Sequence, residues 1–273
     1  MIRWLCSAAL ALSAPTGVVA QQQPLRALEN GFEARPWEAV GRLDIAGKAF
    51  CTGALISPDV VLTAAHCLFD TSSGARINPE TIEFRAGWRQ GRASAYRAVS
   101  RAVVHPKYSY AAAVSPERVR DDIALLQLAH PIRNTTIHPF DTGARPLKGA
   151  SVSVLSYVRG RAEAPSLQEH CTVLDAQQGV LVTSCSVDFG SSGAPIFAVS
   201  QGRAQIVSVV SAKTEINGSD IALGTSLEGS VAFLRAELVA GKGGYTSSSP
   251  LPIRLRVGEG RSATGAKFIR LGE

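Results

Sequence analysis

Three short stretches of this sequence contain the residue types needed for nucleophilic catalysis by a serine. They are residues 62–67 (Leu-Thr-Ala-Ala-His-Cys), 122–126 (Asp-Ile-Ala-Leu-Leu) and 190–195 (Gly-Ser-Ser-Gly-Ala-Pro), in the chain order His, Asp, Ser. A serine hydroxyl is a weak nucleophile, so it needs an imidazole to take its proton and a carboxylate to hold that imidazole in one tautomer. Together the stretches predict acyl-transfer chemistry.

The third stretch is a turn of small residues, in which successive backbone N–H groups can point at one place. The amides of Gly190 and Ser192 would then bind the oxyanion that forms when Ser192 attacks a carbonyl. By itself, a Gly/Ser-rich segment is more often an ordinary turn. Because His66 and an acidic partner accompany it, we interpret Ser192 as a nucleophile.

These motifs resemble those of the trypsin and chymotrypsin-like serine peptidases, over residues 37–238, and Thr-Ala-Ala-His-Cys is the most specific match. The resemblance implies that His66 is the general base and that Asp122, directly before Ile-Ala-Leu-Leu, orients it. Asp121 is then expected to be a solvated neighbour. The remaining histidines occur in loop-like contexts and are expected to be structural or solvated: His105, His130, His138 and His170.

The residue before the nucleophile is usually Asp in this family, where it pairs with a newly cut amino terminus. Here it is Ser191, and no Ile-Val-Gly-Gly start is present. The chain therefore resembles the bacterial glutamyl-endopeptidase-like and heat-shock-protease-like branches, and activation through that salt bridge is not expected.

The resemblance also implies a substrate pocket at Ser186, Val210 and Ser211. Ser186 occupies the position that is acidic in trypsin, which argues against a strict Arg/Lys preference. Asp188 is only two residues from Ser186, so the sequence does not decide whether the pocket contains a negative charge.

Short apolar runs rich in Val, Ile and Thr, bounded by turn formers, predict an all-β sandwich or barrel. Apolar residues at three- and four-residue steps predict one clear helix, at 230–240, stopped by Gly241. The resemblance implies two antiparallel β-barrels with the active site in the cleft between them. The expected strands are 39–45, 53–56, 60–62, 81–86, 95–104, 123–128, 150–156, 180–183, 194–199 and 205–211.

The domain organisation is expected in five parts. A charged start and a short apolar run predict a secretory signal peptide at 1–20. It is followed by an N-terminal segment or removable propeptide at 21–36, a first lobe at 37–140, a second lobe with the helix at 141–241, and a basic tail at 242–273. The tail begins with a Gly/Ser-rich linker and contains two segments that predict a hairpin, 253–257 and 267–271.

The cysteines point to disulfides. Five are present, and Cys6 would leave with the signal, so an even number remains in an exported chain. The resemblance implies the pairs Cys51–Cys67 and Cys171–Cys185. Without a Cys-x-x-Cys or paired histidine spacing, we expect no metal, and no cofactor is implied.

The net charge is +6, and the tail contains six basic and two acidic residues, a net +4. It has too few aromatic residues for a nucleic-acid platform, so we expect a solvated extension or one that contacts anionic surfaces. We expect an exported enzyme, secreted or periplasmic, that acts as a monomeric serine endopeptidase on protein or peptide substrates. The alternative is an inactive relative that uses the cleft as a binding module.

Overall fold

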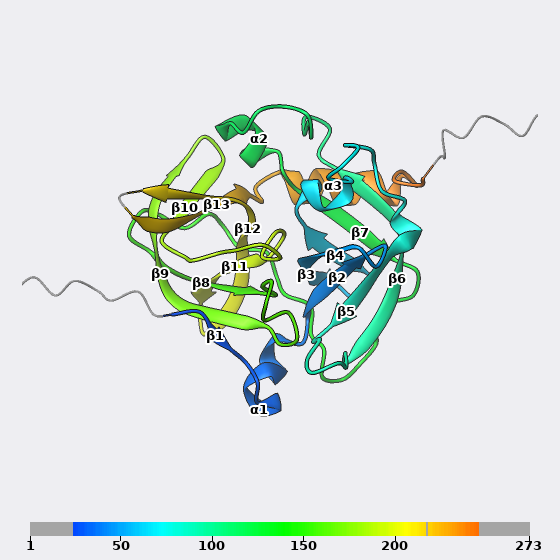
Figure 1. The fold of residues 1–273 in the computed structure, drawn as a ribbon, viewed down its shortest axis with the longest axis horizontal. Coiled ribbons are helices and arrows are strands. Elements are labelled where there is room, and N and C mark those ends of the chain that lie inside the picture. Colours follow the sequence, from blue (N-terminus) through cyan, green and yellow to red (C-terminus); the bar gives the residue numbers. More distant parts are fainter. Residues whose placement is uncertain (1–23, 217, 246–273) are drawn as a thin grey trace, which may run out of the picture.

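The computed structural model describes residues 24–216 and 218–245, and its chain is built mainly of β-strands. Two strand bundles lie side by side, with the N-terminal segment below one and the C-terminal helix against the other (Figure 1). The expected signal peptide and the expected tail hairpin lie outside the described residues. Within the described part, no helix is long and apolar enough to cross a membrane.

The first bundle is a closed antiparallel barrel in the order β2-β3-β4-β7-β6-β5. Burial alternates along its strands, as in β5, where Ile82, Phe84 and Ala86 are buried and the residues between them are partly exposed. Its strands are β2 (Val40–Ile45), β3 (Ala49–Ser57), β4 (Val60–Thr63), β5 (Ile82–Ala86), β6 (Ala95–Val104) and β7 (Ala124–Leu128).

The second bundle is also a closed six-stranded barrel, in the order β9-β10-β13-β12-β11-β8, because β8 pairs with β9. β1 (Arg26–Ala27) adds to it as an outer strand on β9. The expected architecture of two antiparallel β-barrels is confirmed. The strands are β8 (Ser151–Ser156), β9 (Ser166–Gln177), β10 (Val180–Thr183), β11 (Pro195–Ser200), β12 (Arg203–Ile216) and β13 (Ser219–Ser226).

The predicted helix is α3 (Ser230–Val239), and it packs on the first barrel although it follows the second in sequence. Leu234 and Leu238 are buried in the core that contains the first-barrel strands. Arg101 Nη1 donates to the carbonyl of Leu238 at 3.0 Å and Arg235 Nη2 to that of Ile56 at 2.8 Å. The helix therefore packs on the first lobe, whereas the sequence assigned it to the second lobe at 141–241.

The remaining helical elements are short. They are α1 (Gly31–Ala34), α2 (Pro116–Arg120) and the 3₁₀ turns η1 (Arg35–Trp37), η2 (Ala65–Leu68) and η3 (Pro79–Thr81). α2 begins at Ser115, whose hydroxyl accepts from the Arg118 amide at 3.2 Å, with Pro116 in the first helical position. It immediately precedes Asp121 and Asp122, which lie between α2 and β7.

The chain passes from one lobe to the other between residues 140 and 141. The Phe140 amide donates to the Leu55 carbonyl in β3, whereas the carbonyl of Asp141 accepts from Ile206 in β12, both at 2.9 Å. In the other direction, Lys242 to Tyr245 return to the first barrel, where the Gly243 carbonyl accepts from the Ala102 amide at 2.9 Å. The first residues of the expected tail are thus packed against β6.

Candidate active site

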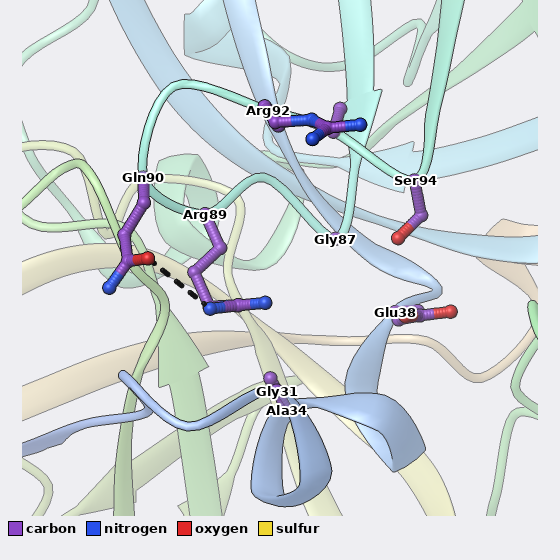
Figure 2. A pocket seen from close by; sticks show the side chains of 9 residues that line it. Gly31, Ala34, Glu38, Gly87, Arg89, Gln90, Arg92 and Ser94 are labelled. Carbon is purple, nitrogen blue, oxygen red and sulfur yellow. Dashed lines mark hydrogen bonds between the residues drawn. The ribbon is translucent and has the colours of Figure 1, made fainter.

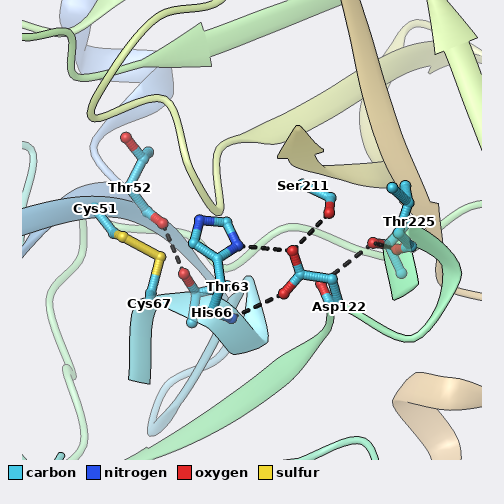
Figure 3. A network of polar contacts seen from close by, with 9 residues as sticks. Cys51, Thr52, Thr63, His66, Cys67, Asp122, Ser211 and Thr225 are labelled. Atoms are coloured by element: carbon cyan, nitrogen blue, oxygen red, sulfur yellow. Dashed lines mark hydrogen bonds and ion pairs between the residues drawn. A yellow bond between two sulfur atoms is a disulfide. The ribbon is translucent and has the colours of Figure 1, made fainter. Parts of the chain in front are cut away.

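His66 and Asp122 meet at the edge of the first barrel (Figure 3). His66 Nδ1 lies 2.7 Å from Asp122 Oδ2, and the His66 amide donates to Asp122 Oδ1 at 2.8 Å. Because an ionised carboxylate only accepts hydrogen bonds, Nδ1 is the protonated ring nitrogen and Nε2 is left as the acceptor. The Asp122 side chain is 4% exposed and that of His66 is 23% exposed, so the imidazole keeps access to a substrate.

The strand β4 and a disulfide place His66. Thr63 ends β4, and the short turn η2 then carries His66 beside Cys67, which is bonded to Cys51 in β3. Cys51, Cys67 and His66 have ligand-type atoms within 4.8 Å of one another, but both sulfurs are committed to the disulfide. Both expected disulfides are present, the second joining Cys171 and Cys185.

Two hydroxyl groups from the second lobe support Asp122. Ser211 Oγ donates to Asp122 Oδ2 at 2.5 Å. Thr225 Oγ1 donates to the Val119 carbonyl at 2.6 Å and lies 3.2 Å from the backbone carbonyl of Asp122. Figure 3 shows both side chains approaching the aspartate from the strands β12 and β13. The sequence interpretation assigned Ser211 to the substrate pocket and did not anticipate this bond to the carboxylate.

The turn that carries Ser192 is attached to the first lobe through Thr52. The Thr52 amide donates to the Ser192 carbonyl at 2.9 Å, and Thr52 Oγ1 donates to the Gly190 carbonyl at 2.8 Å. Since Thr52 adjoins Cys51, these bonds connect the turn to the disulfide beside His66. They hold the Ser192 turn of the second lobe against β3 of the first lobe.

Glycine is required at two places in this turn. Gly190 (φ +95°) and Gly193 (φ +77°) both have left-handed backbone conformations. A Cβ atom at Gly190 would collide with the Phe50 ring and the Tyr157 carbonyl, and one at Gly193 would collide with Thr63 Oγ1. The motif is therefore needed for close packing of the turn on the first lobe.

The backbone N–H groups of the turn fall into two sets. Those of Ser191, Gly193 and Ala194 donate to the carbonyls of Asp188, Val210 and Ser191, each at 2.9 Å. Within the described part of the chain, the amides of Gly190 and Ser192 donate to no backbone carbonyl. These are the two amides expected to bind an oxyanion, and the turn leaves both available. Among the described residues, the His66 ring is hydrogen-bonded to Asp122 and not to Ser192 Oγ.

Ser191 is fully buried under the turn, with a relative exposure of 1%. Its Oγ donates to Ser156 Oγ at 3.0 Å and accepts from the Asp188 amide at 3.3 Å. A neutral hydroxyl pair thus occupies the position at which zymogen-type members of the resembled family have Asp.

Asp121 is buried, and the expectation that it is solvated is wrong. It is 6% exposed, and its carboxylate accepts from Arg120 Nε at 3.1 Å. His105 Nδ1 lies 3.6 Å from the same carboxylate, and burial lowers the pKa of His105. The other three histidines outside the site, His130, His138 and His170, are exposed as expected.

The residues assigned to the substrate pocket do not share one role. The Ser186 amide donates to Gln168 Oε1 at 2.7 Å, which ties this position to β9. Val210 is buried and pairs with Gly193 and Ala194 through its backbone. Beside them, Lys213 Nζ donates to Asp188 Oδ1 at 2.9 Å, so the charge of Asp188 is balanced by a lysine. This hydrogen bond lowers the pKa of Asp188.

A separate pocket of about 530 Å³ lies between α1 and the loop that follows β5. Figure 2 shows Arg89 and Gln90 on one side of it, with Glu38 and Gly31 on the other. Arg89 is held by the Glu29 carbonyl at 3.1 Å. The expected catalytic residues are not among those that line this pocket.

The family model for trypsin matches residues 29–226, which is most of the chain. This chain belongs to the trypsin family. The match covers both barrels and all three stretches that contain the expected catalytic residues.

Individual relatives agree with this membership. The chain is 25% identical to a glutamyl endopeptidase from Bacillus licheniformis over 169 residues, 62% of this chain and 51% of the relative. It is 29% identical to human cathepsin G over 167 residues, 59% of this chain and 60% of that protein. The matched part thus spans 51% and 60% of the length of these two relatives, less than two thirds of either.

A solved structure supports the fold. The structure described as Glu endopeptidase in complex with MPD superimposes with a TM-score of 0.66 at 18% identity, covering 82% of this chain and 99% of that one. At this identity the likeness shows a shared fold, and the glutamyl endopeptidase relative agrees with the branch that the neutral Ser191 predicts.

Proposed function

We propose that this trypsin-family protein is an exported serine endopeptidase that uses Ser192, His66 and Asp122 as a catalytic triad. The observation that carries the proposal is the 2.7 Å contact between His66 Nδ1 and the buried Asp122 carboxylate, next to a turn that presents Ser192. It leaves His66 Nε2 as the proton acceptor and fixes the ring orientation.

In the proposed reaction, Ser192 Oγ attacks the scissile carbonyl while His66 Nε2 takes the hydroxyl proton. The oxyanion forms at the amides of Gly190 and Ser192, which donate to no backbone carbonyl in the described chain. His66 then protonates the leaving amine, giving an acyl-enzyme that water hydrolyses by the same steps. Asp122 stays ionised and stabilises the imidazolium, with Ser211 Oγ and the His66 amide hydrogen-bonded to it.

The substrates are proposed to be proteins or peptides. One relative is named glutamyl endopeptidase, which makes cleavage after an acidic residue the first preference to test. The serine at position 186 supports this choice over an Arg/Lys preference, because it supplies no carboxylate to bind a basic side chain.

The decisive experiment is labelling with a fluorophosphonate, which reacts with an activated serine. The mature protein and its Ser192→Ala variant are compared, and both are then incubated with a mixed peptide library read by mass spectrometry. Labelling and cleavage that both depend on Ser192 support the proposal. Absence of labelling in correctly disulfide-bonded protein would contradict it and favour a binding role for the cleft.

Export is proposed from the N-terminal sequence and from the two disulfides, since such bonds persist in oxidising compartments. We further propose that the basic residues beyond Tyr245 contact anionic surfaces. Deletion of residues 246–273 tests this: binding to anionic vesicles should weaken and hydrolysis should persist. Unchanged vesicle binding by the shortened chain would overturn it.

A further inference from the structure

An exposed aromatic ring flanked by two cations lies at the edge of the nucleophile turn. Phe189, directly before Gly190, is 61% exposed. The guanidinium carbon of Arg159 lies 4.6 Å from the centre of its ring and Lys213 Nζ lies 5.6 Å from it. A large apolar side chain left in water three residues from the expected nucleophile is suited to contact a substrate.

The two cations differ in their partners. Lys213 is paired with Asp188 at 2.9 Å, and this hydrogen bond raises the pKa of Lys213. In the part of the chain that the structure describes, Arg159 forms no ion pair with a carboxylate, and its side chain is exposed. The Arg159 amide donates to the Phe189 carbonyl at 2.7 Å, so its backbone moves with the turn. Arg159 is therefore a positioned cation that has no ion-paired carboxylate and is attracted to Asp188 only at longer range.

The surroundings of Arg159 indicate which part of a substrate it meets. One wall of the turn is β12, which contains Ser211 and Lys213 and borders the expected pocket for the acyl part. A second wall is formed by Phe50 and Tyr157, which lie against Gly190, and Arg159 follows Tyr157 by two residues. A peptide that crosses Ser192 from the first wall to the second places its leaving-group part beside Arg159.

We propose that Arg159, held against the Phe189 ring, is a specificity-determining residue that binds an acidic side chain on the leaving-group side of the scissile bond. This inference rests on the proposed peptidase function and names a second position of substrate recognition. A planar guanidinium stacked on a ring loses little conformational freedom when it binds a carboxylate. The ion pair between Arg159 and the substrate carboxylate therefore stabilises binding even near the surface.

The test uses matched peptides that contain Glu or Gln at the first or second position after the cleaved bond and are otherwise identical. For the wild-type protein we expect kcat/KM to be about fivefold higher with Glu, a factor that corresponds to the upper range for an exposed ion pair. The advantage should fall as salt increases. In Arg159→Gln the Glu and Gln peptides should be cleaved equally, and Arg159→Lys should restore part of the preference.

The matched control is Arg133→Gln, which removes an exposed arginine in the segment after β7 and should keep the wild-type preference. Fluorophosphonate labelling should be the same in all variants, because Arg159 takes no part in activating Ser192. Labelled wild type that cleaves Glu and Gln peptides equally, or an Arg159→Gln variant that keeps the preference, would overturn this inference alone. Unlabelled wild type would overturn the proposed function as well.

Discussion

Ser191 Oγ donates a 3.0 Å hydrogen bond to Ser156 Oγ, and both side chains are buried beneath the turn that carries Ser192. The second bond, from the Asp188 amide to Ser191 Oγ, closes the turn on itself. Since neither partner is charged, this arrangement needs no amino terminus to neutralise it. The hydrogen bonds of Ser191 thus form without a newly cut amino terminus.

Replacing Ser191 tests this neutral support. Ser191→Asp would bury a carboxylate without a cation, and we expect the free energy of unfolding to fall by about 3–5 kcal/mol. Ser191→Ala leaves Ser156 without its donor and should cost about 1–3 kcal/mol. Urea unfolding measures both, and the exposed Ser200→Ala should change stability by less than about 0.5 kcal/mol. Equal stability of the Asp variant and the wild type would contradict the structural reason.

The adjacent residues Asp121 and Asp122 should separate activity from stability. For Asp122→Asn we expect kcat/KM to fall by about 10⁴-fold, a factor established for this peptidase family and not a value from this structure. Asp121→Asn should leave kcat/KM nearly unchanged but destabilise the fold, because Arg120 and His105 lose their buried partner. Peptide hydrolysis and urea unfolding of both variants provide the comparison. Similar losses of activity at the two positions would remove the assignment of Asp122.

Ser211→Ala should show that Ser211 is a positioning residue for Asp122. A hydrogen bond to a charged group is worth about 1.5–3 kcal/mol, so we expect kcat to fall by about 10- to 100-fold. KM should change little, because the bond orients the carboxylate and does not bind substrate. Steady-state kinetics would measure this, with Thr214→Ala, at an exposed position of the same strand, as the control. A change confined to KM would contradict the positioning role and indicate that Ser211 contributes only to the substrate pocket.

His105 should make stability depend on pH. Burial lowers its pKa below the usual 6.5, although Asp121 opposes this shift and Lys107 and Arg120 add to it. Between the two pKa values the unfolded chain binds more protons, so this contribution to stability is present above about pH 6.5 and is lost as pH falls through the folded pKa. Unfolding free energies from pH 5 to 7.5 should therefore rise less steeply for His105→Gln than for wild type. The exposed His130→Gln should keep the wild-type slope, and identical slopes for all three proteins would count against the prediction.

The sequence predicted those strands whose buried residues are apolar. β6 and β10 have the expected limits because turn-forming residues precede and follow each of these strands in the sequence. β9 was not anticipated, since it places Ser166 and Gln168 in the interior, and hydrophobic periodicity does not detect buried polar residues. β13 was missed for a similar reason, because two of its buried residues, Gly224 and Thr225, are not large apolar residues.

The site shows the same division between local and long-range signals. His66, Asp122 and Ser192 lie in local motifs, and the structure brings the first two into contact as expected. The support from Ser211 was missed because it joins residues 89 positions apart, a relationship that only the folded barrels create. Asp121 is likewise in contact with His105, from the loop after β6, and the residues next to Asp121 in sequence do not predict this contact.

The segment at 21–36, for which the sequence left removal as a propeptide open, is expected to stay in the active protein. Its described residues are built into the fold: β1 pairs with β9, the Leu28 amide donates to the Pro165 carbonyl at 2.8 Å, and the Leu28 side chain is 1% exposed. We therefore expect the active protein to retain Leu28, which mass spectrometry of its amino terminus would show. Leu28→Ala should lower the free energy of unfolding by about 2–5 kcal/mol, whereas Leu147→Ala, at an 82% exposed residue, should have little effect. A fully active chain that begins after Leu28 would show instead that the segment is dispensable, because its packing would then contribute nothing that the two barrels need.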